Sequence, residues 1–230
     1  MPDLLATATD RLSALRAHML QRAWQAVLVP SSDPHLSEYL PEHWQGREWL
    51  SGFTGSSGTL LVSAHAAALF TDSRYWEQAE AELAGTGIDL VKLDGPAVPA
   101  YVQWLRAQTT SGAAGGTGAP SVLAVDGQVL SLGSVAPLRE ALSAAGWALH
   151  TADDVLAGAW PDRPALPTAA VYEHLPPHAA TPRRDKLAAV REALRAKGAT
   201  HHWVATLDDL AWLLNLRGAD VNYNPVFLGH

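Results

Sequence analysis

A short polar segment holds the first side chains that could do chemistry. Asp33, His35 and Glu38 lie close together in the sequence, and carboxylate and imidazole groups can together bind a divalent cation. Turn and capping hydrogen bonds are the competing interpretation, and the one we favour, because Asp side chains often accept hydrogen bonds from nearby backbone amides.

Two adjacent pairs are interpreted as structural. His201 and His202 fall in an expected strand, where neighbouring side chains point to opposite faces and cannot share one ion. Asp208 and Asp209 come where a helix should begin, and negative charge is favourable at a helix N-terminus.

Motifs for self-sufficient catalysis are absent from the sequence. It has no His-Glu-x-x-His zinc motif, no phosphate-binding loop ending in Gly-Lys-Ser/Thr and no Gly-x-Ser-x-Gly elbow. It also has no cysteine, which excludes disulfides and thiolate chemistry. The glycine-rich residues 52–58 are interpreted as a turn with positive φ angles before a strand rather than as a ligand cradle.

The elements that must position these residues follow from apolar periodicity and turn signals. Helices are expected over residues 9–23, 46–51, 74–84, 98–108, 131–145, 182–197 and 207–216. Strands are expected over residues 25–30, 59–63, 66–70, 88–92, 122–125, 147–150 and 201–205. Alternation of the two predicts an α/β fold, and the hairpin near residues 64–65 predicts a mixed rather than a purely parallel sheet.

Composition changes along the chain suggest the domain organisation. Residues 1–160 are expected to form one domain, with a mobile glycine-rich surface loop over 111–120. Prolines then cluster, so residues 161–180 are expected to be an extended linker. Residues 181–230, with Thr181 expected to cap the first helix, look small for a complete core, so we expect a second domain that is cut short.

Charge and hydropathy exclude some partners. The net charge is −7; residues 1–160 hold 8 Lys/Arg and 16 Asp/Glu. This acidity argues against nucleic acid as a partner. Without a long apolar run or a basic N-terminal region, neither a membrane span nor a secretory signal is expected, and the cysteine-free composition fits a cytoplasmic location.

Three groups of motifs resemble the Xaa-Pro aminopeptidases, in the order in which that family has them. The first comprises residues 30–39 (Pro-Ser-Ser-Asp-Pro-His-Leu-Ser-Glu-Tyr), 47–59 (Arg-Glu-Trp-Leu-Ser-Gly-Phe-Thr-Gly-Ser-Ser-Gly-Thr) and 70–76 (Phe-Thr-Asp-Ser-Arg-Tyr-Trp). The second is residues 160–164 (Trp-Pro-Asp-Arg-Pro), and the third is residues 207–221 with 224–227 (Asn-Pro-Val-Phe). Ser57, where alanine is usual, is a conservative departure.

The resemblance implies a creatinase-type N-terminal domain with a mixed sheet flanked by helices, followed by the start of a second similar domain. It also implies a "pita-bread" catalytic domain, absent from this chain, in which two manganese ions activate a hydroxide that cleaves the bond before proline. The parent protein is thus expected to be a homodimeric metallo-aminopeptidase acting on peptides with proline at the second position. The chain alone is expected to be inactive and to hold no metal.

The resemblance further implies that the N-terminal domains shape the active-site entrance and take part in subunit contacts. Arg74 is our candidate for reaching the cleft, because its permanent charge can orient a peptide; pairing with Asp72 or Glu77 is the alternative. Asp33 and His35 are additional candidates for substrate binding at the rim.

Two other functions stay open beside the peptidase. One is a non-catalytic binding or scaffold module that retains the creatinase-type domain. The other is a creatinase-like amidinohydrolase, which the turn at residues 51–56 and the proline-rich linker disfavour.

Overall fold

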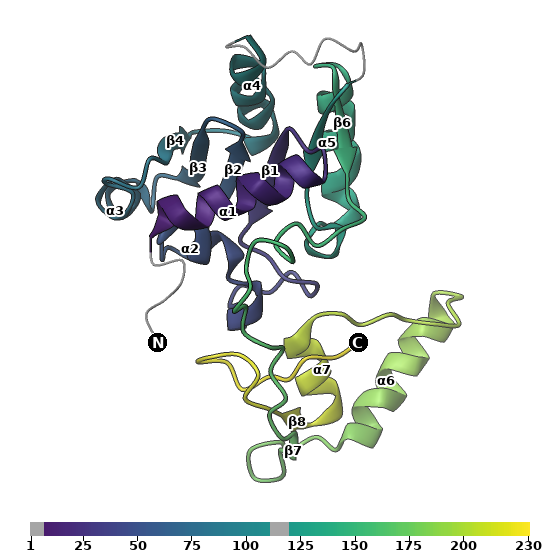
Figure 1. Ribbon diagram of the computed structural model, residues 1–230. Coiled ribbons are helices and arrows are strands. Elements are labelled where there is room, and N and C mark those ends of the chain that lie inside the picture. Colours follow the sequence, from purple (N-terminus) through teal and green to yellow (C-terminus); the bar gives the residue numbers. More distant parts are fainter. Residues whose placement is uncertain (1–6, 111–119) are drawn as a thin grey trace. The chain divides into compact units, whose positions relative to one another are not determined.

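The computed structural model describes residues 7–110 and 120–230, without the side chains of residues 109 and 110 (Figure 1). Two compact units are present. One comprises Met1–Ser32 with Gln45–Arg163, and the other comprises Asp33–Trp44 with Pro164–His230. The glycine-rich loop expected over 111–120 lies almost entirely outside the described residues.

A six-stranded mixed sheet forms the first unit, which confirms the predicted fold class. The strand order is β4-β3-β2-β1-β5-β6, with β1 antiparallel to β2 and β2 antiparallel to β3, while the pairs β3–β4, β1–β5 and β5–β6 are parallel. The strands are β1 (Ala26–Pro30), β2 (Thr59–Ser63), β3 (Ala67–Asp72), β4 (Asp89–Leu93), β5 (Ser121–Ala124) and β6 (Trp147–His150).

Helices cover both faces of this sheet. Along β1, Val27 and Val29 join the core cluster beneath the first three helices, and the alternating Ala26 and Leu28 join the other cluster. Figure 1 shows α1 lying across one face. The helices are α1 (Ala8–Gln21), α2 (Gly46–Ser51), α3 (Trp76–Glu82), α4 (Ala97–Thr110) and α5 (Leu132–Ser143).

Two local expectations in the first unit are corrected. The helix expected from residue 74 begins at Trp76, because the Tyr75 amide donates to the Asp72 carbonyl in a turn. Leu20 recurs at helical spacing with Leu12, Leu15 and Met19, which predicts a place on one buried apolar stripe, but it is 83% exposed. One residue beyond Met19, it is rotated about 100° around the helix axis from the buried face.

The second unit is small and mostly helical. It contains α6 (Arg183–Ala196), α7 (Leu207–Leu214) and the two-residue strands β7 (Tyr172–Glu173) and β8 (Leu216–Arg217), which pair antiparallel. Its core cluster consists of Leu207, Ala211, Val221 and Val226. The strand β7 lies within the predicted linker, so part of that segment is paired rather than simply extended.

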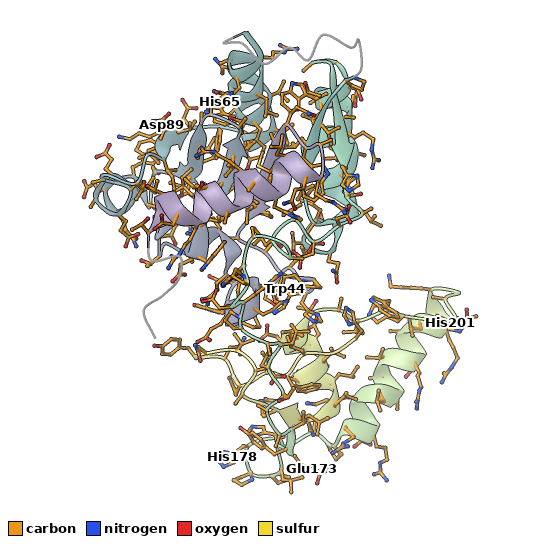
Figure 2. All side chains as sticks on the ribbon, in the orientation of Figure 1. Trp44, His65, Asp89, Glu173, His178 and His201 are labelled. Atoms are coloured by element: carbon orange, nitrogen blue, oxygen red, sulfur yellow. The ribbon has the colours of Figure 1, made fainter. Side chains whose placement is uncertain are left out.

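Two expectations drawn from the sequence are wrong in this unit. Residues 201–205 form no strand, because a strand needs a partner to satisfy its backbone groups and none of the described residues pairs with them. His201 lies beyond the end of α6 (Figure 2). The helix α6 has Pro182 rather than Thr181 as its first flanking residue, and no side chain caps it.

Membrane-crossing helices are not found: within the described ranges, no helix has the length and apolar character needed to span a bilayer.

Candidate functional site

A glycine-rich turn, residues 52–58, connects α2 to β2 and carries the polar groups of the candidate site. Gly52 ends α2 in the left-handed region with φ 74°, and its amide donates to the Glu48 carbonyl. Gly55 does not have a positive φ. A Cβ there would lie 2.3 Å from the Phe53 ring and 2.8 Å from the Tyr75 ring. The predicted positive φ is therefore confirmed at Gly52, whereas Gly55 is needed for close packing.

The buried Arg47 side chain of α2 holds the turn through hydrogen bonds to its backbone carbonyls. Its guanidinium donates to the carbonyls of Phe53 and Gly55, the latter at 2.6 Å, and to Ser31 Oγ at 2.9 Å. Burial lowers the pKa of Arg47 to about 10, so it stays charged at neutral pH. No role for Arg47 was predicted; the signal was an arginine on the short helix just before the glycines.

Glu82 of α3 anchors the turn from the other side. Its carboxylate accepts from the Thr54 amide at 2.8 Å and from the Thr54 hydroxyl at 2.7 Å. Burial acts to raise the pKa of Glu82, but the hydrogen bonds from Thr54 and Gln78 and the charge of Arg47 outweigh it and lower the pKa. Arg47 and Glu82, which carry opposite charges, thus hold neighbouring residues 53–55 of this turn.

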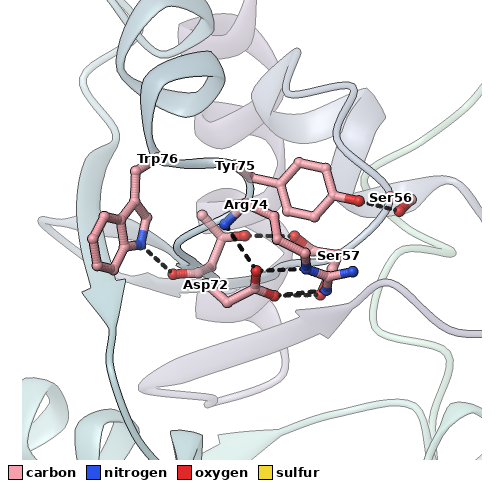
Figure 3. A network of polar contacts seen from close by, with 7 residues as sticks. Ser56, Ser57, Asp72, Arg74, Tyr75 and Trp76 are labelled. Carbon is pink, nitrogen blue, oxygen red and sulfur yellow. Dashed lines mark hydrogen bonds and ion pairs between the residues drawn. The ribbon is translucent and has the colours of Figure 1, made fainter.

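Serine hydroxyls stand at the apex of the turn (Figure 3). The Ser56 and Tyr75 hydroxyls share a 2.7 Å hydrogen bond, and Ser57 Oγ donates to Asp72 over 3.4 Å. The Thr71 hydroxyl donates to the Ser57 carbonyl at 2.6 Å. These contacts hold the turn against the end of β3 and leave little freedom to the backbone.

Arg74 forms a two-pronged ion pair with Asp72. Its Nε and Nη2 lie 2.8 Å from Oδ1 and Oδ2, respectively, and its guanidinium also lies over the Tyr75 ring at 5.1 Å. The hydrogen bonds from Arg74 lower the pKa of Asp72 to about 2. The alternative interpretation of Arg74, pairing with Asp72, is thus observed, and its substrate-binding role stays a prediction.

A cavity of about 270 Å³ opens beside this network. Pro30, Asp72 and Leu93, at the carboxyl ends of β1, β3 and β4, line it together with Ser57 and Tyr101. The carboxyl ends of strands are where α/β sheets commonly bind ligands. Burial raises the pKa of the Tyr101 phenol, against a hydrogen bond with Thr59, so Tyr101 is neutral here.

Asp33 and His35 belong to the other unit. The fully buried Asp33 accepts through Oδ1 from the amides of His35 and Ser37, both at 2.9 Å, which is the turn geometry that we favoured over cation binding. His35 Nδ1 lies 2.8 Å from the Ala205 carbonyl. Since a carbonyl can only accept, Nδ1 carries the proton, and Nε2 of a neutral ring is left as an acceptor.

A metal site needs several carboxylate or imidazole ligands close together. Among the described residues, no three His, Asp or Glu side chains are grouped so that they could hold an ion. The resemblance places the two manganese ions in a catalytic domain outside this chain, and that expectation stays a prediction.

The fold and the site together define a class: a two-unit α/β protein with a braced polar turn and no metal-ligand cluster in its described residues. A family model described as the creatinase/prolidase N-terminal domain matches residues 11–158, and a second model with the same description matches residues 162–230. The chain belongs to the creatinase/prolidase N-terminal domain family, which confirms the resemblance.

Curated proteins of similar sequence identify the branch of the family to which this chain is similar. A probable Xaa-Pro aminopeptidase P of Talaromyces marneffei is 38% identical over 224 residues, covering 96% of this chain and 33% of the relative. One of Metarhizium acridum is 34% identical over 232 residues, covering 98% and 36%. The chain thus spans about a third of the length of the curated relatives that it matches.

A solved structure shares the fold over nearly the whole chain. It is an X-prolyl aminopeptidase from Caenorhabditis elegans, described as a cytosolic enzyme with a di-nuclear active site. Its TM-score is 0.81 at 30% identity, covering 96% of this chain and 36% of that one.

Proposed function

We propose that this chain is the N-terminal part of a metal-dependent Xaa-Pro aminopeptidase, which releases the residue that precedes proline at the second position of a peptide. The observation that carries the proposal is the 38% identity to a probable Xaa-Pro aminopeptidase P across 96% of the chain. The structural match to an X-prolyl aminopeptidase, with a TM-score of 0.81, also supports it.

The metal chemistry belongs, in this proposal, to a catalytic domain outside this chain. The C. elegans neighbour is described as having a di-nuclear site, and the described residues here offer no group that could hold an ion. We propose two manganese ions in that domain, where they would activate a hydroxide. This chain alone would then be inactive.

The proposed contribution of this chain is to shape the entrance to the active site and to take part in the contacts of a cytoplasmic homodimer. The rigid turn at residues 52–58 and the adjacent cavity support a role in shaping, because a braced backbone presents Ser56 and Ser57 at fixed positions. A module that kept this architecture only for binding would share these features.

Arg74 is the proposed peptide contact, with His35 and Asp33 as further candidates. The Arg74 side chain is 67% exposed, and exposed ion pairs contribute only about 0–1 kcal/mol to stability. Exchange of Asp72 for a carboxylate of the substrate would therefore cost little. Asp33, being fully buried, would act by holding the loop that carries His35.

The test uses the protein that carries this chain together with its catalytic domain. We expect it to release the first residue of a peptide with proline at position two, but not of the alanine counterpart, and to need Mn²⁺ after treatment with a chelator. The Arg74→Ala variant is expected to lose about tenfold in kcat/KM, as loss of one charged contact would predict. Arg184→Ala, which breaks another exposed Arg–Asp pair, is the matched control and should have no effect.

The possible outcomes distinguish a failure of the proposed peptidase activity from a failure of the proposed role of Arg74. Failure to cleave the proline peptide would contradict the peptidase and favour the binding module, and hydrolysis of creatine would favour the amidinohydrolase. Peptide cleavage by the isolated 230-residue chain would overturn the placement of the site. An unchanged kcat/KM in Arg74→Ala would remove only the proposed role of Arg74.

A further inference from the structure

A second and larger cavity lies in the first unit, away from the turn at residues 52–58. Its volume is about 630 Å³, within the range of roughly 300–1,000 Å³ typical of small-molecule sites. It is bounded by α1, by the turn between β2 and β3 and by the first residues of β5 and β6. Figure 2 shows His65 at the turn between β2 and β3. The cavity therefore lies at the ends of the strands opposite to those that line the smaller one.

One face of α1 forms a wall of this cavity. Ser13, Arg16, Ala17 and Leu20 recur at positions i, i+3, i+4 and i+7 and all line it. This is not the buried stripe of the helix, which explains why Leu20 is 83% exposed although it is apolar.

Apolar side chains form much of the rest. The indoles of Trp24 and Trp147 are 6% and 4% exposed, and Met19 is 2% exposed. Their buried positions fix the shape of this wall, against which an apolar body can pack.

Arg16 supplies a positive charge to this largely apolar wall. Its Nε donates to the Ser63 carbonyl at 3.0 Å, which fixes the guanidinium, and burial lowers the pKa of Arg16 with no carboxylate opposing the shift. None of the lining residues in the described part of the chain is acidic. Among the described residues, no carboxylate forms an ion pair with Arg16.

A half-buried guanidinium without a counter-charge is costly, and a bound anion offsets that cost. The other polar lining groups, including Gln25, Gln108 and His65, carry no negative charge. The charge of Arg16 therefore favours an anionic group on the ligand, and the apolar walls favour an apolar body attached to that group.

We propose that this cavity binds a small carboxylate with an apolar body, its carboxylate on the Arg16 guanidinium and its body between Trp24, Trp147 and Leu20. The site is separate from the turn at residues 52–58, and the proposal does not depend on the proposed peptidase function.

The test measures binding of 3-phenylpropionate to the full 230-residue chain, with uncharged 3-phenylpropanol as the matched ligand. Calorimetry gives the affinity, and NMR shifts of the Trp24 and Trp147 indoles and the His65 amide locate the site. The acid should bind at least about tenfold more tightly than the alcohol, as a charge-assisted contact predicts. The dipeptide N-acetyl-glycyl-phenylalanine also ends in a carboxylate beside a phenyl ring. Comparison of its affinity with that of 3-phenylpropionate shows whether the site prefers a peptide C-terminus or a free small acid.

Variants test the role of Arg16. Arg16→Gln should bring the affinity for the acid down to that for the alcohol, whereas Arg139→Gln on the exposed side of α5 should change nothing. Should Arg16→Gln fold poorly, Leu20→Glu and Leu20→Gln serve instead, because Leu20 is exposed; the charged variant should weaken binding of the acid more than the neutral one.

The proposal is overturned by any of three results. These are equal affinity for the acid and the alcohol, an absence of shifts at the indoles of Trp24 and Trp147, and equal losses in Arg16→Gln and Arg139→Gln.

Discussion

At the scale of single residues, the ion pair between Asp72 and Arg74 has a consequence that depends on pH. The hydrogen bonds from Arg74 lower the pKa of Asp72 from 3.8 to about 2. A carboxylate with a lowered pKa in the folded state contributes stability above its unfolded pKa. That contribution is lost as the pH falls through the folded value. The affected window therefore runs from about pH 4 down to about pH 2, and the contribution is small because the pair is exposed.

Replacing Arg74 by glutamine should raise the pKa of Asp72 toward 3.8, because both charged hydrogen bonds are lost. The measurement is a titration of the Asp72 carboxyl carbon by NMR. Arg184→Gln serves as the control and should leave the midpoint of Asp72 near 2. An Asp72 midpoint unchanged by Arg74→Gln would show that the ion pair does not form in solution.

At the scale of elements, the turn between α2 and β2 is held by contacts from three directions. Arg47 binds its carbonyls from α2, Glu82 binds its amide from α3 and Thr71 binds the Ser57 carbonyl from β3. Because the backbone cannot move to accommodate a new atom, its glycines should differ sharply in their tolerance of a methyl group.

Three glycine-to-alanine variants measure that difference. Gly55→Ala should lower the free energy of unfolding by about 2 kcal/mol, because its Cβ would overlap the buried Phe53 ring. Gly52→Ala should cost about 1 kcal/mol, because φ is +74° in open space. Gly95→Ala, with no atom within 4 Å and no positive φ, is the control and should be nearly neutral.

Urea unfolding, followed through the amide signals of β2 and β3, ranks these variants. Similar losses in the free energy of unfolding for Gly55→Ala and Gly95→Ala would mean that the turn can shift to accommodate a methyl group. The close approach of Phe53 would then not be the reason for glycine at position 55.

At the scale of the whole molecule, the chain leaves its first unit and returns to it. Residues 33–44 belong to the second unit, where His35 contacts the Ala205 carbonyl and His43 Nδ1 lies 2.7 Å from the Pro164 carbonyl. All six strands of the large sheet and both of its core clusters lie in residues before 164. The division predicted from the sequence, with residues 1–160 in one domain, stays a prediction.

A chain of residues 1–163 should therefore keep its sheet but lose the order of residues 33–44, because the partners of those residues lie in the missing part. Amide NMR spectra compare it with the full chain. Native shifts should persist in β1 to β6 and change across residues 33–44. Native shifts retained across residues 33–44 would contradict their assignment to the second unit.

Local patterns in the sequence were enough to predict many of the helices, strands and turns. The periods of α1 and β1, the β2–β3 hairpin and the first turn of α7 with Asp208 and Asp209 depend on neighbours within a few residues. Backbone sterics, turn chemistry and side-chain alternation act over that distance, so these elements could be derived before any tertiary contact was known.

Contacts between distant residues decided the rest. The burial of Arg47 under its turn, the exposure of Leu20 and the absence of a strand at residues 201–205 each depend on what packs nearby in space. The spacing of residues along the sequence cannot show which distant residue will pack against a given side chain. The sequence by itself thus determined the family, the α/β class and the glycine-rich turn. Only the tertiary structure decided which charges brace that turn and that Arg16 faces the larger cavity, because burial and charge pairing are properties of the folded arrangement.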